Sequence, residues 1–568
     1  MITSEMIATR SEVIADRGVV AGGHPLEAEA GIAALRAGGN AIDAVVAAAF
    51  AGFVVEPASC GLGGYGRLAI YLGPEERFVT VDHYARAPAA AHAAMFEVDP
   101  EKPDKYYGFP HTKGMRAERG PLATAVPGAV AGLCAALERY GRLPLTRVLE
   151  PAVGYAEAGV TVDANLQLVI AGRLAEIREQ PAAAAFLLRN DAPPAIAGQF
   201  GGGDRLDTCA LACTLKRIAD KGAAGFHEGP VAEAIERASA SAGGILRAQD
   251  IAAYRPRLLH EQPSRYRGHD YITAFDQVGI EALNILECVD IARLGPDSTE
   301  FRHLVAEALA CAFIDSMTHY GDPDFESSPV QGLASREFAK LRAAQISLDR
   351  AMPRPVPPAD PWPFENTKYA PAKIADAPAR PPLGGTSQMA AADREGNMAT
   401  LCTSLSSGFG SLIYVPEIGV MLNNCMQNFD PRPHMPNRIR PGKMPIFAVP
   451  TLVATRDGRA VFGAAGSGGY RITTAVLHPL MHAIDFGMSL QAAVDAPRVH
   501  CQGEDTFVDA RIPAEVRDAL AALGHRVVVQ RDLPGVNCFG RVAAVSIDER
   551  RRLHATSWPP WATSAAGI

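Results

Sequence analysis

Thr386 is the residue whose type and position point most directly to chemistry. It lies in Gly384-Gly385-Thr386-Ser387, after a proline-rich run and at the start of an apolar strand pattern. A threonine hydroxyl within a chain is a weak nucleophile, but an α-amine freed by cleavage has a pKa of ~8 and can accept the hydroxyl proton. A cut between Gly385 and Thr386 would therefore make a nucleophile with its own base. The alternative is that Thr386 is only the first residue of a strand.

A second hydroxyl is expected to face Thr386. Residues 386–393 and 398–405 have the pattern of two strands around the turn at 394–397. Thr386 and Ser404 each lie nine residues from position 395, the centre of this hairpin. Facing residues of an antiparallel pair approach to about 5 Å. Ser404 is thus predicted to orient the hydroxyl or the amine of Thr386, and the alternative is an ordinary cross-strand hydrogen bond.

A glycine-rich turn offers a site for negative charge. Gly466-Ser467-Gly468-Gly469 lies between a strand at 460–465 and a helix that starts near Ile472. Backbone N–H groups at a helix N-terminus favour an anion, so Gly468 and Gly469 are predicted to form an oxyanion hole. A plain strand-to-helix turn would use similar residues.

Metal and cofactor sites are not predicted. His303, His319, His478 and His482 fall on apolar helical faces, and they are interpreted as structural. Cys209 and Cys213 are the only close cysteine pair, without a second pair or nearby histidines. The glycines at 61–66 fit G-x-G-x-x-G, but they precede a strand rather than a helix, which argues against a dinucleotide. No cofactor is expected.

The elements around these residues indicate an α/β protein. Residues 26–36 and 41–54 read as two buried helices, and the region from 127 to 345 is mostly helical in pattern. Ten prolines between 353 and 382 exclude helix and central strand, so residues 351–385 are predicted to be an extended, exposed linker. After it the chain is strand-rich, with one long helix from about residue 472.

Composition limits the partners. The net charge is -8, and no cluster of lysine and arginine suggests nucleic-acid binding. The most hydrophobic stretch, 41–55, contains Asp43 and is shorter than the ~20 residues of a membrane span. No apolar signal segment precedes Gly18, so the expected compartment is the cytoplasm.

With these residues in hand, the chain resembles the γ-glutamyltranspeptidase family of N-terminal nucleophile hydrolases over nearly its whole length. The motifs that carry the resemblance are Gly23-His24-Pro25-Leu26, residues 37–44, the glycine loop at 61–66, residues 126–132, 321–325, 393–397, 422–424, 441–443, 468–472 and 495–498.

The resemblance implies a four-layer αββα fold made as a proenzyme. It would cut itself into a large subunit, 1–385, and a small subunit, 386–568, which stay together as one globular unit. Thr386 would be the nucleophile, Ser404 would take the place of the family's orienting threonine, and Gly468 and Gly469 would be the oxyanion donors.

The residues that recognise a γ-glutamyl group in the family are replaced. Tyr84 stands where the family has an arginine for the α-carboxylate, and Arg86 comes two residues later. Gln427-Asn428-Phe429 replaces Asp-Asp-Phe, so the carboxylate that holds the α-amine is missing. Each such charge-assisted partner is worth ~1.5–3 kcal/mol. Recognition of a γ-glutamyl group should therefore be weakened by several orders of magnitude.

Three further departures from the family's pattern are visible. The segment 445–451 is apolar and shorter than in the family, without its paired serines, and Ser406 replaces a usual asparagine. Gln388 replaces a common histidine. The candidate lining of the acyl pocket is Tyr84, Arg86, Ser406, Asn428 and Phe447.

The sequence therefore predicts a self-processing amidohydrolase or acyltransferase for a small amide, with water or an amine as acceptor. One alternative is a true γ-glutamyl transferase or glutathione hydrolase, if Arg86 reaches a carboxylate. Another is an uncleaved relative that binds a ligand without catalysis. A further homodimer is compatible with the sequence.

Overall fold

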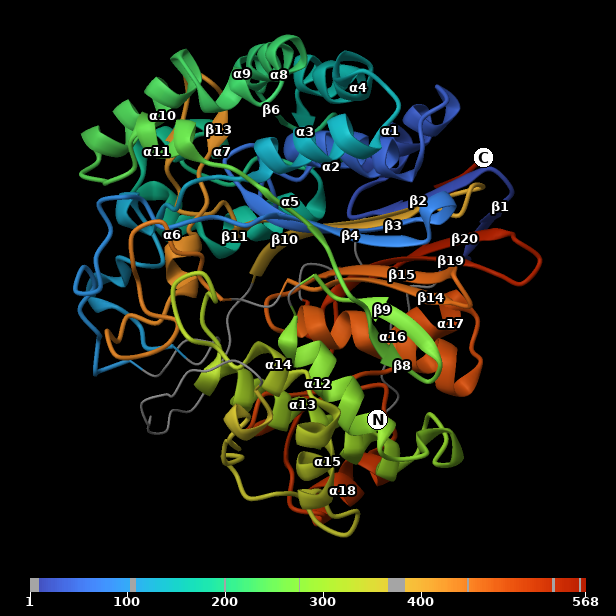
Figure 1. The fold of residues 1–568 in the computed structure, drawn as a ribbon. Helices are drawn as coiled ribbons and strands as arrows, with labels where there is room; N and C mark the ends of the chain where they lie inside the picture. Colours follow the sequence, from blue (N-terminus) through green and yellow to red (C-terminus); the bar gives the residue numbers. More distant parts are fainter. Residues whose placement is uncertain are drawn as a thin grey trace.

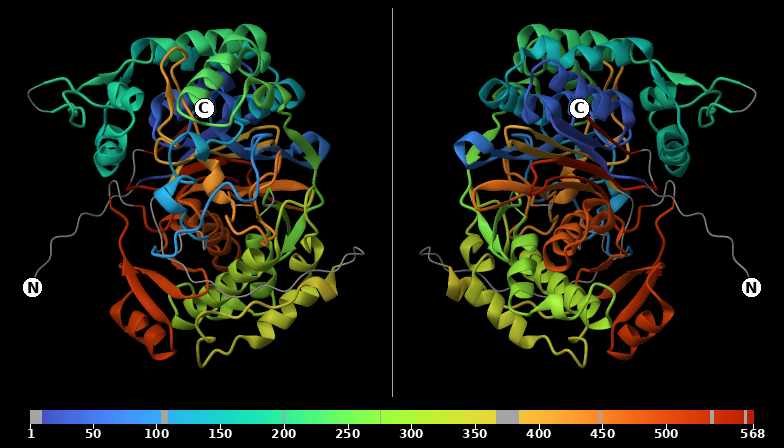
Figure 2. Two further views of the ribbon diagram at one scale, coloured as in Figure 1. Left: turned by 90° about the vertical axis from the view of Figure 1, so that its left-hand side faces the viewer. Right: turned by 90° about the vertical axis from the view of Figure 1, so that its right-hand side faces the viewer.

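The computed structural model describes residues 10–102, 109–198, 201–274, 276–365, 384–446, 449–533, 537–560 and 563–568. Two seven-stranded sheets lie face to face, and helices cover both outer faces (Figures 1 and 2). This is the four-layer αββα arrangement that the sequence resemblance implied.

The first sheet, called sheet I, joins strands from both ends of the chain. Its order is β21 (Ser564–Gly567), β2 (Gly18–Gly22), β10 (Gly384–Asp393), β11 (Met398–Ser407), β3 (Tyr65–Leu72), β4 (Arg77–His83) and β7 (Arg257–His260). The second, sheet II, has the order β1 (Val13–Ala15), β20 (Leu553–Ser557), β19 (Arg541–Ile547), β15 (Arg459–Ser467), β14 (Thr451–Arg456), β9 (His269–Ile272) and β8 (Ser264–Tyr266).

The central hairpin β10–β11 has the predicted register. Thr386 pairs with Ser404, and the turn at 394–397 closes the hairpin. A register irregularity falls between Gly385 and Thr386, so the backbone is displaced from regular pairing at the predicted cleavage bond. The regular ladder therefore begins at Thr386.

Side chains alternate along β10 between two cores. Met389 and Ala391 belong to the core under the helices, whereas Ala390 and Ala392 belong to the core between the sheets. Because the side-chain period of a strand is two, Thr386 shares the face that points between the sheets.

Helices α1 to α11 are grouped over sheet I (Figure 1). They are α1 (Pro25–Arg36), α2 (Ala41–Val55), α3 (Ala129–Tyr140), α4 (Leu145–Ala158), α5 (Ala164–Gly172), α6 (Leu174–Arg178), α7 (Pro181–Leu187), α8 (Cys209–Lys221), α9 (Ala224–His227), α10 (Pro230–Ser241) and α11 (Ala248–Ala253). Every residue of α2 is buried, and the Asn40 side chain accepts from the N–H groups of Ile42 and Asp43 at its start. Among the helices described, none is long and apolar enough to cross a bilayer.

The helices on the side of sheet II come from two separate parts of the chain. They are α12 (Gln277–Glu287), α13 (Thr299–His319), α14 (Val330–Leu333), α15 (Arg336–Gln345), α16 (Arg471–Phe486), α17 (Leu490–Asp495) and α18 (Ala514–Ala522). Helix α16 packs on β15, and α12 packs on α13 and α16.

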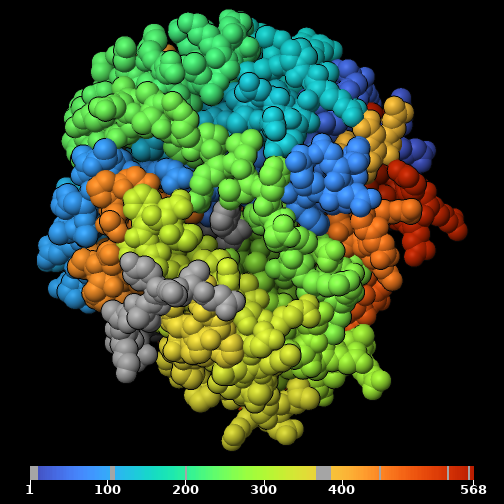
Figure 3. Space-filling model, in the orientation of Figure 1, coloured from blue at the N-terminus to red at the C-terminus, as the bar shows by residue number. Residues whose placement is uncertain are grey.

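Three small sheets complete the strands described. Two have two strands each, β5 (Val160–Thr161) with β6 (Arg205–Leu206) and β12 (Tyr414–Val415) with β13 (Val420–Met421). The third has three strands, β16 (Val499–Cys501), β17 (Asp505–Asp509) and β18 (Arg526–Gln530). Segments near residues 87–120 and 411–443 lie side by side (Figure 3), since Ser411 O accepts from Gly120 N and Lys443 O from Ala87 N.

The region from 127 to 345 is mostly helical, as predicted, and holds α3 to α15; the strands β7, β8 and β9 within it are only three or four residues long and give little periodic signal. One expectation needs correction. The predicted exposure of the linker is wrong at Val356, which is 1% exposed. Arg354, in the same segment, forms an ion pair with Glu307 at 2.5 Å. Residues 366–383 of the linker lie outside the described residues.

Candidate active site

Thr386 and Ser404 are in direct contact. Their hydroxyl oxygens are 3.0 Å apart, and both residues are buried, at 3% and 2% exposed. Ser404 Oγ donates to the carbonyl oxygen of Gly385 at 2.7 Å and accepts from Ser406 N at 2.8 Å. The second hydroxyl therefore contacts both the predicted nucleophile and the carbonyl of the predicted cleavage bond.

This geometry fixes which hydroxyl is the donor in the hydrogen bond between Thr386 and Ser404. A serine hydroxyl has one proton, and a carbonyl oxygen can only accept. Since Ser404 gives its proton to Gly385 O, the Thr386 hydroxyl donates to Ser404 Oγ. Proton transfer from Thr386 through Ser404 to the Gly385 carbonyl is therefore a connected path.

Ser406 and Asn428 lie beyond Ser404 in a neutral hydrogen-bond network. Ser406 has a left-handed backbone, with φ of 84°, which aims its N–H at Ser404. Its hydroxyl accepts from Gln427 Nε2 at 2.9 Å and donates to Asn428 Oδ1 at 3.3 Å. The sequence candidates Ser406 and Asn428 are thus brought together with the hydroxyl pair.

Tyr84 joins the same network. Asn428 Nδ2 donates to the hydroxyls of Tyr65 and Tyr84, each at 3.2 Å, and the two rings are 4.4 Å apart. Burial raises the pKa of both tyrosines well above the ordinary value, so both remain neutral. The Arg67 guanidinium lies over the Tyr84 ring, 4.7 Å from its centre. Tyr84 and Asn428, which were predicted to replace the family's glutamyl-binding arginine and aspartate, are therefore uncharged and bonded to each other.

The turn between β15 and α16 has the backbone that its glycines suggest. Gly468 has φ of 134° and Gly469 has φ of 67°. A Cβ on Gly468 would lie 2.9 Å from Gly540 Cα. Both the conformation and the close approach require glycine at position 468.

Arg541 connects this turn to Thr386, and sequence reasoning missed it. Its guanidinium donates to Thr386 O at 2.5 Å, to Ser467 Oγ at 2.7 Å and to Glu56 Oε1 at 3.1 Å. Arg541 is 155 positions from Thr386, so only the pairing of β19 with β15 brings it here. No local motif marks it.

A buried acidic pair lies on the other face of β10. Ser387 Oγ donates to Glu27 Oε1 at 3.1 Å, and Gly23 N donates to Glu27 Oε2 at 2.6 Å. Burial, followed by the charge of Glu56, raises the pKa of Glu27 well above its usual range. For Glu56, burial acts to raise the pKa, but Arg541 and further partners outweigh it, so its pKa is lowered. This pair therefore holds one negative charge against Arg541.

Two sequence candidates are not placed in this cluster. Arg86 is held through its backbone, whose carbonyl accepts from Val126 N at 2.8 Å, and its charge acts on Asp82. Within the described residues, no hydrogen bond joins Arg86 to Thr386 or Asn428. Phe447 lies outside the described residues.

The G-x-G-x-x-G loop serves strand packing. A Cβ on Gly64 would lie 2.5 Å from Ser404 O, and one on Gly66 would lie 2.2 Å from Cys402 O. These glycines let β3 approach β11 closely beside the hydroxyl pair.

Two groups of described side chains bring three possible metal ligands together: Glu27, Glu56 and Cys60, and His303, Glu307 and His525. Each group already contacts a buried guanidinium. Arg541 pairs with Glu56 at 3.1 Å and Arg354 with Glu307 at 2.5 Å. Because an arginine supplies the positive charge in each, both groups can be explained as ion-pair networks of the protein.

Comparison with known proteins gives the same family as the motifs. The sequence model of the gamma-glutamyltranspeptidase family matches residues 28–567 of this chain. The acylase ACY 1 proenzyme of Pseudomonas sp. (strain SE83) is 36% identical over 90% of this chain and 87% of its own. The glutathione hydrolase proenzyme of Bacillus subtilis (strain 168) is 30% identical over 90% of this chain and 85% of its own.

Solved structures agree with this result. Cephalosporin acylase from Bacillus halodurans superposes with a TM-score of 0.86 at 26% identity, covering 100% of this chain and 98% of that one. The gamma-glutamyltranspeptidase of Helicobacter pylori gives a TM-score of 0.53 at 30% identity, covering 62% of this chain and 95% of that one. With the family model, the relatives and the fold in agreement, this chain is an enzyme of the γ-glutamyltranspeptidase family, an amidohydrolase or acyltransferase in type.

Proposed function

We propose that the chain cuts itself between Gly385 and Thr386 and then hydrolyses amides with Thr386 as the N-terminal nucleophile. The observation that carries this proposal is the contact of Thr386 Oγ1 with Ser404 Oγ at 3.0 Å, with the Ser404 hydroxyl donating to Gly385 O. Nucleophile, relay and the carbonyl to be attacked are thus adjacent in the uncut chain.

In the self-cleavage step, Thr386 Oγ1 attacks the Gly385 carbonyl carbon, and its proton passes to Ser404. As the C–N bond breaks, Ser404 passes this proton to the nitrogen, so that an ester forms between Gly385 and the Thr386 hydroxyl oxygen and the nitrogen becomes the free α-amine. Water hydrolyses the ester to a Gly385 carboxylate and restores the hydroxyl. Arg541, bonded to Thr386 O at 2.5 Å, would hold the new N-terminal residue in place.

In the amidase reaction, the Thr386 amine takes the hydroxyl proton as the oxygen attacks the substrate carbonyl. The N–H groups of Gly468 and Gly469 would stabilise the oxyanion, and the protonated amine would return the proton to the leaving nitrogen. Water, or an amine acceptor, then releases the acyl group. The first step leaves the acyl group as an ester on Thr386, and its release in the second step restores the free hydroxyl and amine.

The acyl group we propose is less charged than glutamate. The network of Tyr65, Tyr84 and Asn428 is buried and uncharged, so it offers no carboxylate to an α-ammonium, and the guanidinium of Arg67 over the Tyr84 ring is already paired with Asp82 at 3.3 Å. Burial of an ion without a partner costs several kcal/mol. The 36% identity to an acylase proenzyme supports the same choice.

The division into subunits of residues 1–385 and 386–568 is part of this proposal. Its support is the word proenzyme in the names of the acylase and glutathione hydrolase relatives. The Helicobacter pylori chain also supports it, since 95% of that chain matches only 62% of this one. Sheet I contains strands from both sides of residue 385, so the two pieces would stay joined by the ladders of β2 with β10 and β3 with β11.

The test combines electrophoresis with turnover. The wild-type protein should give pieces of 385 and 183 residues (568 less 385), and Thr386→Ala should stay whole. The mature protein should hydrolyse neutral acyl anilides at least ~100-fold better in kcat/KM than a γ-glutamyl anilide, the factor for losing two charge-assisted partners. An intact wild-type chain without turnover would favour a ligand-binding relative.

A true γ-glutamyl transferase or glutathione hydrolase is the second candidate. It is favoured by the 30% identity to the Bacillus subtilis glutathione hydrolase proenzyme. Preferred turnover of the γ-glutamyl anilide would select it over the proposal above.

A further inference from the structure

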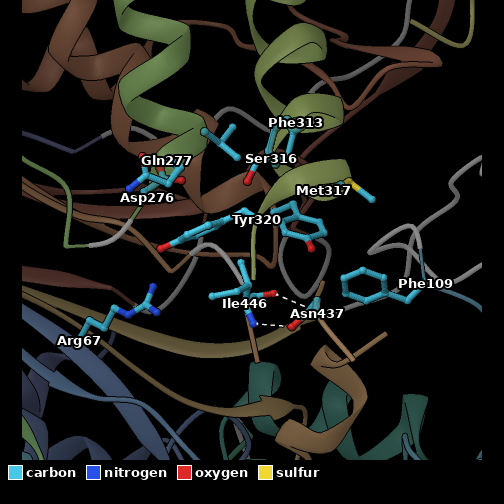
Figure 4. Close-up of a pocket in the computed structure, with 12 residues that line it drawn as sticks. Arg67, Phe109, Asp276, Gln277, Phe313, Ser316, Met317, Tyr320, Asn437 and Ile446 are labelled. Atoms are coloured by element: carbon cyan, nitrogen blue, oxygen red, sulfur yellow. Dashed lines mark hydrogen bonds between the residues drawn. The ribbon is translucent and has the colours of Figure 1, made fainter. Parts of the chain in front are cut away.

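A cavity adjoins the Thr386 cluster, and the proposed mechanism leaves it unused. Its enclosed space is small, about 20 Å³, which suits a single group the size of a water molecule or an ammonium group; the figure is about 470 Å³ when all space between the atoms and the open mouth are counted. Its walls include Arg67, Asp276, Gln277, Phe313 and Tyr470. Figure 4 shows Asp276 and Gln277 on one side of this space, and Arg67 and Ile446 on the other.

Three contacts join this cavity to the candidate active site. Tyr470 follows Gly469 directly in the chain, and it lines the cavity. Asn437, on another wall, donates from Nδ2 to Asn428 O at 2.8 Å. Arg67 is two residues from Tyr65 on β3, and its guanidinium covers the Tyr84 ring. A substrate held at Thr386 could therefore extend into this cavity.

Two unpartnered acceptor atoms are found at this wall. Asp276 is 1% exposed and Gln277 is 6% exposed. Asp276 Oδ2 accepts from Thr473 Oγ1 at 3.2 Å, which ties it to the first turn of α16. Asp276 Oδ1 and Gln277 Oε1, by contrast, are buried and have no hydrogen-bond partner among the described residues. A buried acceptor without a donor costs about 1–3 kcal/mol, so this pair calls for a ligand that donates.

We propose, as a deepening of the proposed function, that Asp276 and Gln277 bind an amino group of the amide substrate. An amino group supplies several N–H donors, enough for both acceptors, and Asp276 adds an opposite charge. Phe313 and Tyr470, whose ring centres are 5.4 Å apart, would border the carbon chain that carries it. This site is separate from the Tyr84–Asn428 network.

The charges around Asp276 are compatible with this ligand. Burial raises the pKa of Asp276 to about 7, whereas the N–H groups of Gly279 and Val278, the Thr473 hydroxyl and the Arg67 charge lower it. Arg67 is itself paired with Asp82 at 3.3 Å, which offsets its charge. A bound ammonium group would favour the ionised carboxylate.

The test measures binding directly, so that it does not depend on catalysis. Butylamine hydrochloride, 1-butanol and sodium butyrate are titrated against the full Thr386→Ala chain by saturation-transfer NMR. Butylamine should bind at least ~10-fold more tightly than butanol, since charge-assisted hydrogen bonds exceed neutral ones. Equal affinity for all three probes, or tightest binding of butyrate, would overturn the proposal.

Two variants localise the effect, and one serves as a matched control. Asp276→Asn should remove most of the preference for butylamine, and Gln277→Met should reduce it without altering a charge. Glu281→Gln changes a buried carboxyl in the same helix, outside the cavity wall, and should keep the preference. Preserved preference in both cavity variants would contradict the assignment.

The failure of this inference is distinguishable from failure of the proposed function. If the wild-type chain is never cut and turns over no amide, but butylamine binds as described, only the catalytic proposal falls. If the chain is cut and turns over neutral amides, and butylamine shows no preference, only the amino-group site falls.

Discussion

Ser404→Ala tests the relay between Thr386 and the Gly385 carbonyl. Ser404 Oγ donates to Gly385 O at 2.7 Å, and that oxygen becomes the oxyanion during self-cleavage. Loss of one such donor slows a comparable acyl transfer about 10²–10³-fold, or roughly 2.7–4 kcal/mol. The substitution also leaves Ser406 N without its 2.8 Å acceptor, at a cost in stability of about 1–3 kcal/mol.

The assay is a time course of the full chain converting to its two pieces, followed by electrophoresis and intact mass. Thr403→Val is the matched control: it removes a buried hydroxyl one residue earlier, which bonds to Tyr65 O at 3.3 Å on the opposite face of β11. Ser404→Thr should restore cleavage, and Thr403→Val should mature at the wild-type rate. Cleavage of Ser404→Ala at the wild-type rate would refute the relay.

Three other predictions concern the groups around the site and the buried histidines. Arg541→Met should lower the free energy of unfolding in urea titrations by about 3–5 kcal/mol, because it leaves Glu56 buried without its partner. The double variant Arg541→Met with Glu56→Gln should recover part of this loss. Equal stability of the single and double variants would contradict the pairing. Gly468→Ala should impair turnover more than Gly469→Ala, because the φ of 134° at Gly468 lies outside the left-handed region to which the φ of 67° at Gly469 belongs, and a Cβ on Gly468 would lie 2.9 Å from Gly540 Cα. The opposite order in anilide assays would count against this explanation. Burial lowers the pKa of His482 from 6.5 to about 4, so the buried neutral form contributes fully to stability above pH 6.5. That contribution is lost as the pH falls from 6.5 towards 4, at roughly 1.4 kcal/mol per pH unit. His482→Gln should flatten this part of the plot of unfolding free energy against pH, and an unchanged slope would exclude His482 as its source.

The sequence predicts the β10–β11 hairpin well because the information that specifies it is local. Residues 394–397 form a turn, apolar residues alternate on either side, and the pairing of Thr386 with Ser404 follows from counting. The helices at 25–36 and 41–55 are equally local, with clear periodicity and capping residues. The family motifs add the layer arrangement.

The parts that sequence reasoning missed depend on tertiary contacts. Arg541 reaches Thr386 only because β19 pairs with β15, and Glu27 reaches Ser387 across 360 positions. Asp276 has no motif around it, and its unpartnered oxygen is visible only once α12 and α16 are packed. Arg86 stays a prediction: its charge acts on Asp82, and no hydrogen bond joins it to Asn428 within the described residues.

The N-terminus of the small piece is the most direct measurement of the central claim. Intact-mass analysis and N-terminal sequencing of active protein should show a polypeptide of residues 386–568 that begins with Thr386. An active preparation in which no polypeptide begins at that residue would contradict the account.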